Sequence, residues 1–251
     1  MRTKNTNLTS LLMLAIASLT VLSCDKKEED NYGPSKNLIF HETFESGNPF
    51  STAHNLETGD WDYALQYVDS IAQDGNYSAR FEIREDQPLV ASGKRSEVTV
   101  IWSSNETLTK KAWYSFSVYF PATFVSDTTY DVLSQWYNNG SPVRLFVKSD
   151  RLFIDVGSEQ ASKEKFEIGE LTRETWHEFV FKFYHSPFDD GNVTVWHNGK
   201  AKVSRRGGNV YTDALPKWKI GIYESSFEEG TSMVQNRVVY FDNIKVGNEF
   251  A

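Results

Sequence analysis

Hydrophobic and polar residues alternate with a period of two from Asn37 onward. Such a period places successive side chains on opposite faces of a β-strand, whereas an amphipathic helix repeats about every 3.6 residues. No long segment of the chain shows a helical period. We therefore expect β-strands within residues 79–84, 113–120, 143–147, 179–184, 193–197 and 238–246.

The connections between these segments are rich in turn residues. Val193–His197 leads directly into Asn198 and Gly199, the dipeptide most typical of a tight β-hairpin. Many short strands joined by turns predict an all-β fold, an antiparallel β-sandwich of the jelly-roll, concanavalin-like type. The 251 residues show no internal repeat, and this length suits one large all-β domain. We place that domain at residues 37–251.

The N-terminus has a different pattern. Arg2 and Lys4 precede an apolar run, Leu11–Leu22, which is too short to cross a membrane comfortably. The run leads into Val21-Leu22-Ser23-Cys24, which resembles the signal of bacterial lipoproteins, where the cysteine is lipidated. Cys24 is the one cysteine of the chain, so an intramolecular disulfide is excluded. An ordinary secretory signal with a chance cysteine is the alternative.

Residues 24–36 are charged and rich in turn formers, with nothing to bury. We expect residues 1–23 to be a lipoprotein signal peptide and residues 24–36 to be a flexible acidic tether. The expected location is the bacterial outer membrane, facing the periplasm or the cell surface. The lipid anchor is then the only contact with the membrane.

Composition narrows the class of partner. Hydrophobic residues make up 39% of the chain and aromatic residues 14%, which is enough for a substantial core. The net charge of −8 argues against a nucleic-acid partner, which usually requires a basic surface. Binding of an anionic ligand therefore depends on where basic residues gather on the surface. We expect a monomer that binds such a ligand locally.

Three predicted strands carry groups suited to sugar binding on one face and apolar residues on the other. Arg and Gln donate to carboxylate oxygens, and Tyr offers both a ring for the sugar and a hydroxyl for proton transfer. An ordinary solvated sheet face is the alternative. The residues concerned are Arg95, Glu97 and Thr99, then Gln135 and Tyr137, and finally Lys217, Lys219, Gly221 and Tyr223.

The same strands carry a family resemblance. Arg95-Ser96-Glu97-Val98, Gln135-Trp136-Tyr137 and the segment 218–223 resemble, in this order, three motifs of jelly-roll polysaccharide lyases. That group includes alginate lyases, glucuronan lyases and heparin lyase I, and its motifs read approximately Arg-Ser/Thr-Glu-Leu, Gln-x-His and Lys-x-Gly-x-Tyr. The resemblance covers roughly residues 38–248.

One position departs from the family. Tyr137 stands where the second motif usually has a histidine that acts as a base or neutralises the carboxylate. Three explanations stay open: Tyr137 substitutes for the histidine, another histidine such as His185 reaches into the site, or catalysis is lost.

The resemblance implies cleavage of a uronate polymer by β-elimination. Arg95 and Gln135 would bind the uronate carboxylate and stabilise the enolate-like charge that develops. Tyr223 would be the acid, and Tyr137 the second candidate for proton transfer. Lys219 would favour the phenolate form of Tyr223, since a free tyrosine titrates near pH 10. No cofactor is required for this chemistry.

Further residues complete the predicted site. Glu97 is expected to orient Arg95, and Arg84, Arg144 and His185 are further candidates for substrate binding. A structural calcium ion is a separate possibility. Glu42, close to Glu45, and Asp242 resemble carboxylate pairs that meet at the terminal strands of related sandwiches, and oxygen ligands suit calcium. A solvated strand edge is the alternative there.

Two other functions remain open at this point. The first is a surface lipoprotein on the same fold that captures a glycan without cleaving it, because a fold does not determine a function. The other is a glycoside hydrolase, which ranks behind the lyase and the glycan-binding protein. A glycoside hydrolase needs two closely placed carboxylates. No Glu-x-Asp-x-x-Glu strand motif is present. The ultraviolet absorbance of an unsaturated product separates a lyase from both.

Overall fold

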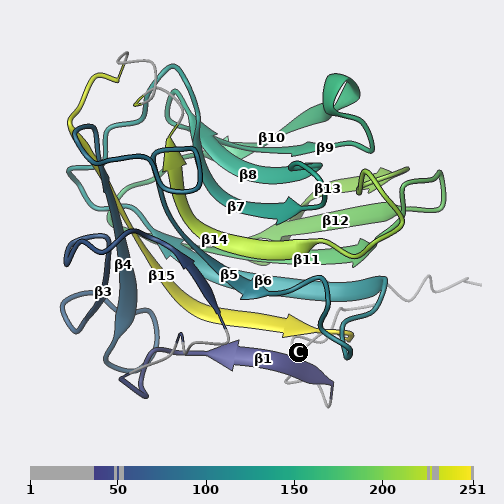
Figure 1. Ribbon diagram of the computed structural model, residues 1–251, viewed down its shortest axis with the longest axis horizontal. Helices are drawn as coiled ribbons and strands as arrows, with labels where there is room; N and C mark the ends of the chain where they lie inside the picture. Colours follow the sequence, from purple (N-terminus) through teal and green to yellow (C-terminus); the bar gives the residue numbers. More distant parts are fainter. Residues whose placement is uncertain (1–36, 48–49, 51–53, 225–226, 228–231, 250–251) are drawn as a thin grey trace, which may run out of the picture. The chain divides into compact units, whose positions relative to one another are not determined.

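The computed structural model describes residues 37–47, 50, 54–224, 227 and 232–249. The described chain consists of strands in two antiparallel sheets, with a single 3₁₀ turn, η1 (Gln160–Ser162). The two sheets lie in layers, with β7 beside β14 in one and β6 beside β11 in the other (Figure 1). The predicted antiparallel β-sandwich is therefore confirmed.

The first sheet has eight strands. Its path is β13 (Lys200–Arg206), β12 (Asn192–His197), β11 (Trp176–Tyr184), β6 (Lys111–Tyr119), β15 (Asn236–Gly247), β4 (Ser78–Arg84) and β3 (Leu65–Val68), and β1 (Leu38–Glu42) also pairs with β15. The second sheet has seven strands. Its path is β10 (Glu164–Glu170), β9 (Arg151–Val156), β8 (Val143–Lys148), β7 (Asp131–Tyr137), β14 (Lys217–Glu224), β5 (Arg95–Ile101) and β2 (Asn55–Glu57).

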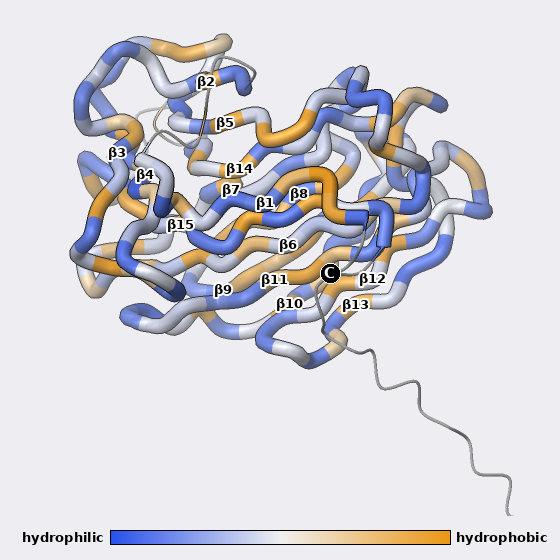
Figure 2. Tube along the Cα trace, turned by 90° about the horizontal axis from the view of Figure 1, so that it is seen from below, coloured by the Kyte–Doolittle hydropathy of each residue, from blue (hydrophilic) through white to orange (hydrophobic). Residues whose placement is uncertain are grey.

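Large aromatic side chains join the two sheets. Trp136 on β7 and Trp218 on β14 are fully buried and stack with ring centres 6.1 Å apart. The ring of Trp136 also meets that of Phe181, from the other sheet, at 4.8 Å. Hydrophobic and hydrophilic positions alternate along the strands, and Figure 2 shows them in orange and blue. Because these tryptophans point into the core, their sequence neighbours must point to the opposite face of the seven-stranded sheet.

The N-terminal predictions fall outside the described residues. The signal peptide, Cys24 and the tether all precede residue 37. Within the part of the chain that the structure describes, no helix is long and apolar enough to cross a membrane.

Candidate active site

The three motif strands are neighbours in the seven-stranded sheet. β14 lies between β5 and β7, and its register pairs Lys219 with Thr99 on one side and with Gln135 on the other. The same register pairs Tyr223 with Arg95. Directly paired residues of an antiparallel ladder point to the same face. The structure thus brings the three predicted polar faces together on one surface, opposite the tryptophan core.

Glu57, on the edge strand β2, contacts three cations of this surface. Its carboxylate is 2.6 Å from Lys219 Nζ, 3.4 Å from Arg95 Nη1 and 3.7 Å from Lys217 Nζ. Only 8% of Glu57 is exposed, so solvent screens these charges weakly. Burial alone would raise the pKa of Glu57, but the hydrogen bond and charge of Lys219, with Lys217 and Arg95, lower it. Glu57 is therefore ionised at neutral pH.

A second buried carboxylate contacts two of these three cations. Glu97 contacts Arg95 Nη1 at 2.9 Å and Lys219 Nζ at 3.9 Å, and it is 1% exposed. Together Glu57 and Glu97 face Arg95, Lys217 and Lys219. This charge cluster, two carboxylates against three cations, has an excess of one positive charge. Such an excess suits the binding of one carboxylate at a time.

Gln135 is fixed by two hydrogen bonds. Its Nε2 donates to Glu97 Oε1, and Ser141 Oγ donates to its Oε1 at 2.5 Å. A side-chain amide nitrogen carries two hydrogens, and the bond to Glu97 uses one of them. The amide is thus oriented by the same carboxylate that orients Arg95.

Each tyrosine lies against a cation of the cluster. Arg95 Cζ is 4.6 Å from the ring centre of Tyr223, while Lys217 Nζ and Lys219 Nζ lie 4.9 Å and 5.7 Å from that of Tyr137. Tyr223 is half-buried, and Tyr137 is exposed. Arg95 is a cation that covers the Tyr223 ring, and the effect of Lys219 on Tyr223 stays a prediction. Lys219 contacts Glu57, Glu97 and the ring of Tyr137.

Gly221 lets β14 approach β5 closely enough to form this surface. Its φ of +133° lies in a region that side chains rarely adopt, and a Cβ there would lie 2.2 Å from the carbonyl oxygen of Ser96. Gly221 is paired with Glu97 and precedes Tyr223 by two residues. The glycine of the third motif is therefore explained by a close approach of two backbones.

Arg144 lies next to the cluster, on β8, where it pairs with Gln135. Its guanidinium binds both oxygens of Asp155, and its Cζ lies 4.8 Å from the ring centre of Tyr130. Asp155 also contacts Lys163 at 3.1 Å. Arg144 therefore shares the face of Gln135 but already has a carboxylate partner.

Two other predicted residues do not join the cluster. Arg84 is on β4 of the other sheet, where its Nε donates to Glu82 at 2.5 Å. His185 is 1% exposed, and its ring nitrogens bond Tyr114 Oη at 3.0 Å and Asn209 Oδ1 at 3.2 Å. Burial lowers the pKa of His185 to about 3. The prediction that His185 reaches the substrate is therefore wrong, because the interior of the sandwich encloses it.

Glu57 and Ser141 were missed from the sequence. Glu57 lies in a strand of only three residues, Asn55–Glu57, too short to show a clear alternation. Its pairing with β5 puts Glu57 opposite Glu97, a contact between residues 40 positions apart. Ser141 sits in the turn between β7 and β8, and nothing in its surroundings marks it in the sequence.

The predicted calcium residues lie at the junction of β1 and β15. Burial raises the pKa of Glu42, and the charge of Asp242 raises it further. Asp242 accepts hydrogen bonds from the backbone N–H groups of Gln73 at 2.8 Å and Asp74 at 3.2 Å. Glu42 is half-buried and Asp242 is buried, and two carboxylates that repel each other are suited to a hard cation such as calcium. No group of three or more His, Cys, Asp or Glu able to hold a metal is present among the described residues.

Glu45 is occupied differently. Its Oε1 accepts hydrogen bonds from the backbone N–H groups of Asn76 at 2.9 Å and Tyr77 at 2.8 Å. It thus closes the loop that precedes β4, and the oxygen set for a cation reduces to Glu42 and Asp242. Calcium binding stays a prediction.

Comparison with known proteins places this arrangement in context. Residues 44–245 match the sequence profile of a family described as "Polysaccharide lyase". A comparison with curated protein sequences gives no match.

Solved structures share the fold at low identity. An endo-β-1,4-glucuronan lyase from the fungus Trichoderma reesei is 16% identical, covers 80% of this chain and 97% of its own, and has a TM-score of 0.61. An alginate lyase from polysaccharide lyase family 7 is 13% identical over 74% and 82% of the two chains, with a TM-score of 0.55. The predicted jelly-roll type is thus confirmed.

A protein of another kind has the same fold. The binding domain of botulinum neurotoxin DC, solved in complex with SialylT, is 10% identical over 85% of this chain and 48% of its own, with a TM-score of 0.56. Structural likeness at such identities shows the fold alone. The function must therefore be argued from the side chains of the site.

Proposed function

This chain belongs to the polysaccharide lyase family, as its three motifs predicted, and we propose that it cleaves a uronate-containing anionic polysaccharide by β-elimination. The observation that carries the proposal is the charge cluster on the face of β5, β14 and β7. There Arg95 and Gln135 are both oriented by Glu97, and a tyrosine lies on either side of them.

The first task of the site is to hold the uronate carboxylate. Arg95 donates to the carboxylate oxygens, and the free N–H of the Gln135 amide adds a neutral donor. Glu57 and Glu97 each contact both Arg95 and Lys219 and so hold these side chains in place, so little reorganisation is needed when substrate binds. These donors stabilise the charge that moves onto the carboxylate when the C5 proton leaves.

The second task is proton transfer. A base removes the C5 proton, the C5–H electron pair forms the C4=C5 double bond, the C4–O4 bond breaks, and an acid protonates O4. Tyr223 is the proposed acid, since Arg95, which binds the carboxylate, also covers its ring. Tyr137 is the proposed base in place of the family histidine, because it is exposed and lies against Lys217 and Lys219.

The test is a screen of the full chain against alginate, glucuronan, ulvan and heparin. The C4=C5 double bond is conjugated with the carboxylate, so cleavage raises the ultraviolet absorbance. We expect a rise with at least one of the four polymers. If none is cleaved but one is bound, capture of a glycan without cleavage replaces the lyase; Tyr137 in place of the histidine is the observation that favours that second function.

Two further proposals concern the whole protein. We propose that Cys24 carries lipid and anchors the chain in the bacterial outer membrane, which the Val21-Leu22-Ser23-Cys24 sequence supports.

We also propose that Glu42 and Asp242 hold a structural calcium ion at the junction of β1 and β15. Burial raises the pKa of both carboxyl groups, and calcium would neutralise the repulsion between them without taking part in the elimination.

A further inference from the structure

A pair of stacked aromatic rings lies in the loop between β2 and β3, outside the charge cluster. Trp61 and Tyr63 stack with ring centres 6.0 Å apart and an angle of 10° between their planes. The guanidinium of Arg84 lies 3.7 Å from the ring centre of Tyr63. Both aromatic residues are half-exposed, and Arg84 is exposed. We call Trp61, Tyr63 and Arg84 the aromatic platform.

The platform is held in place by the chain around it. A Cβ at Gly59 would lie 2.2 Å from the Trp61 ring, so the indole rests directly on this glycine. The loop that carries Trp61 and Tyr63 is tied to β5, because Ser96 Oγ donates to the carbonyl oxygen of Ala64 at 2.6 Å. A rigid aromatic surface of this kind loses little entropy on binding.

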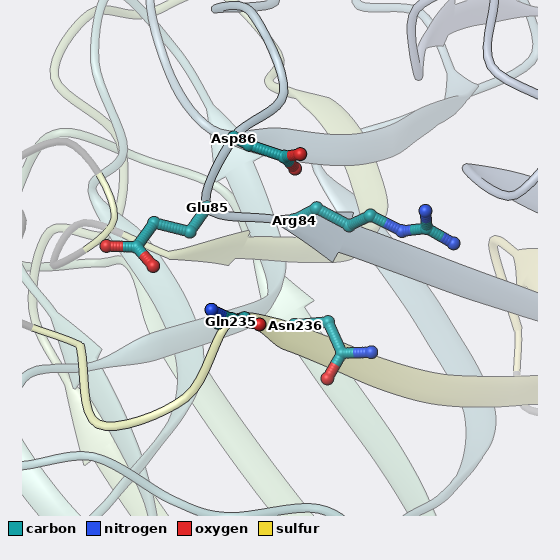
Figure 3. A pocket seen from close by; sticks show the side chains of 5 residues that line it. All are labelled: Arg84, Glu85, Asp86, Gln235 and Asn236. Atoms are coloured by element: carbon teal, nitrogen blue, oxygen red, sulfur yellow. The ribbon is translucent and has the colours of Figure 1, made fainter.

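A polar groove of about 440 Å³ adjoins Arg84. It lies at the end of β4 and the start of β15, and Figure 3 shows that the side chains of Arg84, Asp86 and Asn236 extend to the same side. Burial raises the pKa of Tyr63, the charge of Arg84 lowers it, and the charge of Asp86 raises it further. The remaining lining residues are Glu85 and Gln235.

Hydrogen bonds connect Arg84 and the groove to the segment that carries Arg95. The buried amide of Gln87 accepts from the Arg84 N–H at 2.9 Å and donates to the Arg95 carbonyl oxygen at 3.1 Å. Lys94 Nζ donates to the Glu85 carbonyl oxygen at 2.7 Å. These hydrogen bonds tie the end of β4, which carries Arg84, to the start of β5, which carries Arg95.

The charges of this surface differ from those of the cluster. The groove contains one cation, Arg84, and two carboxylates, Glu85 and Asp86, and Arg84 is already paired with Glu82. It does not favour a second carboxylate. Aromatic rings pack against the C–H face of a sugar, and Asp, Asn and Arg exchange hydrogen bonds with its hydroxyl groups.

We infer that the aromatic platform and the polar groove form a second glycan subsite, which binds a sugar residue of the polysaccharide through its C–H face and hydroxyl groups. The inference deepens the proposed function, on which it rests for the identity of the polymer. It predicts that a long polymer is held at two places, at Arg95 by its carboxylate and at the platform by an uncharged part.

The test is affinity electrophoresis of the full chain in gels that contain alginate, glucuronan, ulvan or heparin, which requires no turnover. Trp61→Ala and Tyr63→Ala should each weaken the retardation by a polymer roughly five- to tenfold. Tyr63→Phe, which keeps the ring, should stay within twofold of the parent. Phe188→Ala, which removes an aromatic ring 66% exposed on another loop, serves as the matched control and should change nothing.

Thermal unfolding of each variant separates loss of binding from loss of fold, and Asp86→Ala, on the exposed turn, tests the groove without touching the packed rings. Folded Trp61→Ala and Tyr63→Ala variants that match the parent in every gel would overturn the inference, as would a parent retarded by none of the polymers. A parent that is retarded without cleaving its polymer contradicts the lyase instead, and the platform variants still decide the subsite.

Discussion

Tyr223 and Arg95 are in contact but have different roles in this site. Its ring lies under the guanidinium of Arg95, and Arg95 is in turn held by Glu57 and Glu97. Removing the phenol oxygen leaves this packing intact. Removing the guanidinium leaves two buried carboxylates with one cation fewer, which is costly in a weakly screened environment. The two substitutions should therefore have different consequences.

We expect Tyr223→Phe to reduce turnover by about 10²–10⁴-fold while glycan binding stays largely intact, because a general acid acts only during the reaction. Arg95→Ala should lower both affinity and rate. Ultraviolet turnover and direct glycan binding, measured for both variants on a polymer that the parent cleaves, check this. Near-normal turnover of Tyr223→Phe would exclude Tyr223 as the acid and move that role to Tyr137.

At the scale of the elements, the site depends on the spacing between β14 and β5. At Gly221 the two backbones approach too closely for any side chain, since the obstructing atoms belong to the Ser96 and Glu97 main chain. A flexible side chain could move aside, whereas a paired strand cannot. The separation of these strands decides whether Tyr223 and Arg95 stay in contact.

Gly221→Ala should therefore destabilise the fold by about 3 kcal/mol or more and abolish turnover. Gly169→Ala, on β10, is the matched control, because a Cβ there has no neighbour within 4 Å and should change stability by less than about 0.5 kcal/mol. Thermal unfolding and ultraviolet turnover measure both. An active Gly221→Ala protein of parental stability would mean that the strands adjust freely.

The junction of β1 and β15 is the second element-level test. Saturating calcium should raise the Tm of the EDTA-treated full chain by roughly 5–10 °C if calcium is present at about a hundredfold excess over its Kd. Glu42→Gln and Asp242→Asn should remove the effect, whereas Glu170→Gln, an exposed carboxylate on β10, should keep it. An equal Tm with and without calcium would contradict the metal site.

At the scale of the whole molecule, buried histidines link stability to pH. His177 Nδ1 and His197 Nε2 lie 2.9 Å apart in stacked rings, and His185, which directly follows β11, is buried as well. Burial lowers the pKa of all three, to about 4 for His197 and about 3 for His185. The folded protein therefore keeps them neutral at a pH where the unfolded chain binds protons.

Because these pKa values are lowered, the protein should lose stability as the pH falls. The stability contributed by each neutral histidine is complete above pH 6.5 and decreases as the pH falls toward its folded pKa, by about 1.4 kcal/mol per pH unit. Urea unfolding at pH 7, 6 and 5 should show this decline. His185→Gln should reduce the slope of the unfolding free energy with pH by the contribution of one bound proton, about 1.4 kcal/mol per pH unit. An unchanged slope would contradict a neutral His185.

The attachment of the chain is the other prediction at this scale. Cys24→Ser should release the protein from the membrane fraction of a bacterial host, because three acyl chains contribute about 0.8 kcal/mol for each buried methylene. Fractionation followed by detection of the protein measures this. Membrane association that survives the substitution would favour an ordinary secretory signal and another contact with the membrane.

The sequence by itself determined which residues share a face. Alternation along a strand is local, so Arg95 with Glu97, Gln135 with Tyr137, and Lys219 with Tyr223 could be grouped from their spacing alone. The family followed from the order of the same three motifs, and the sandwich followed from many short alternating segments.

Only the tertiary structure decided which faces meet and what each side chain contacts. Strand order depends on contacts between distant residues, which no local period encodes. It placed Glu57 of a three-residue strand at the centre of the cluster and put Arg95 against the ring of Tyr223. It also enclosed His185, because an apolar sandwich buries a histidine that finds hydrogen-bond partners, whatever its neighbours in the sequence suggest.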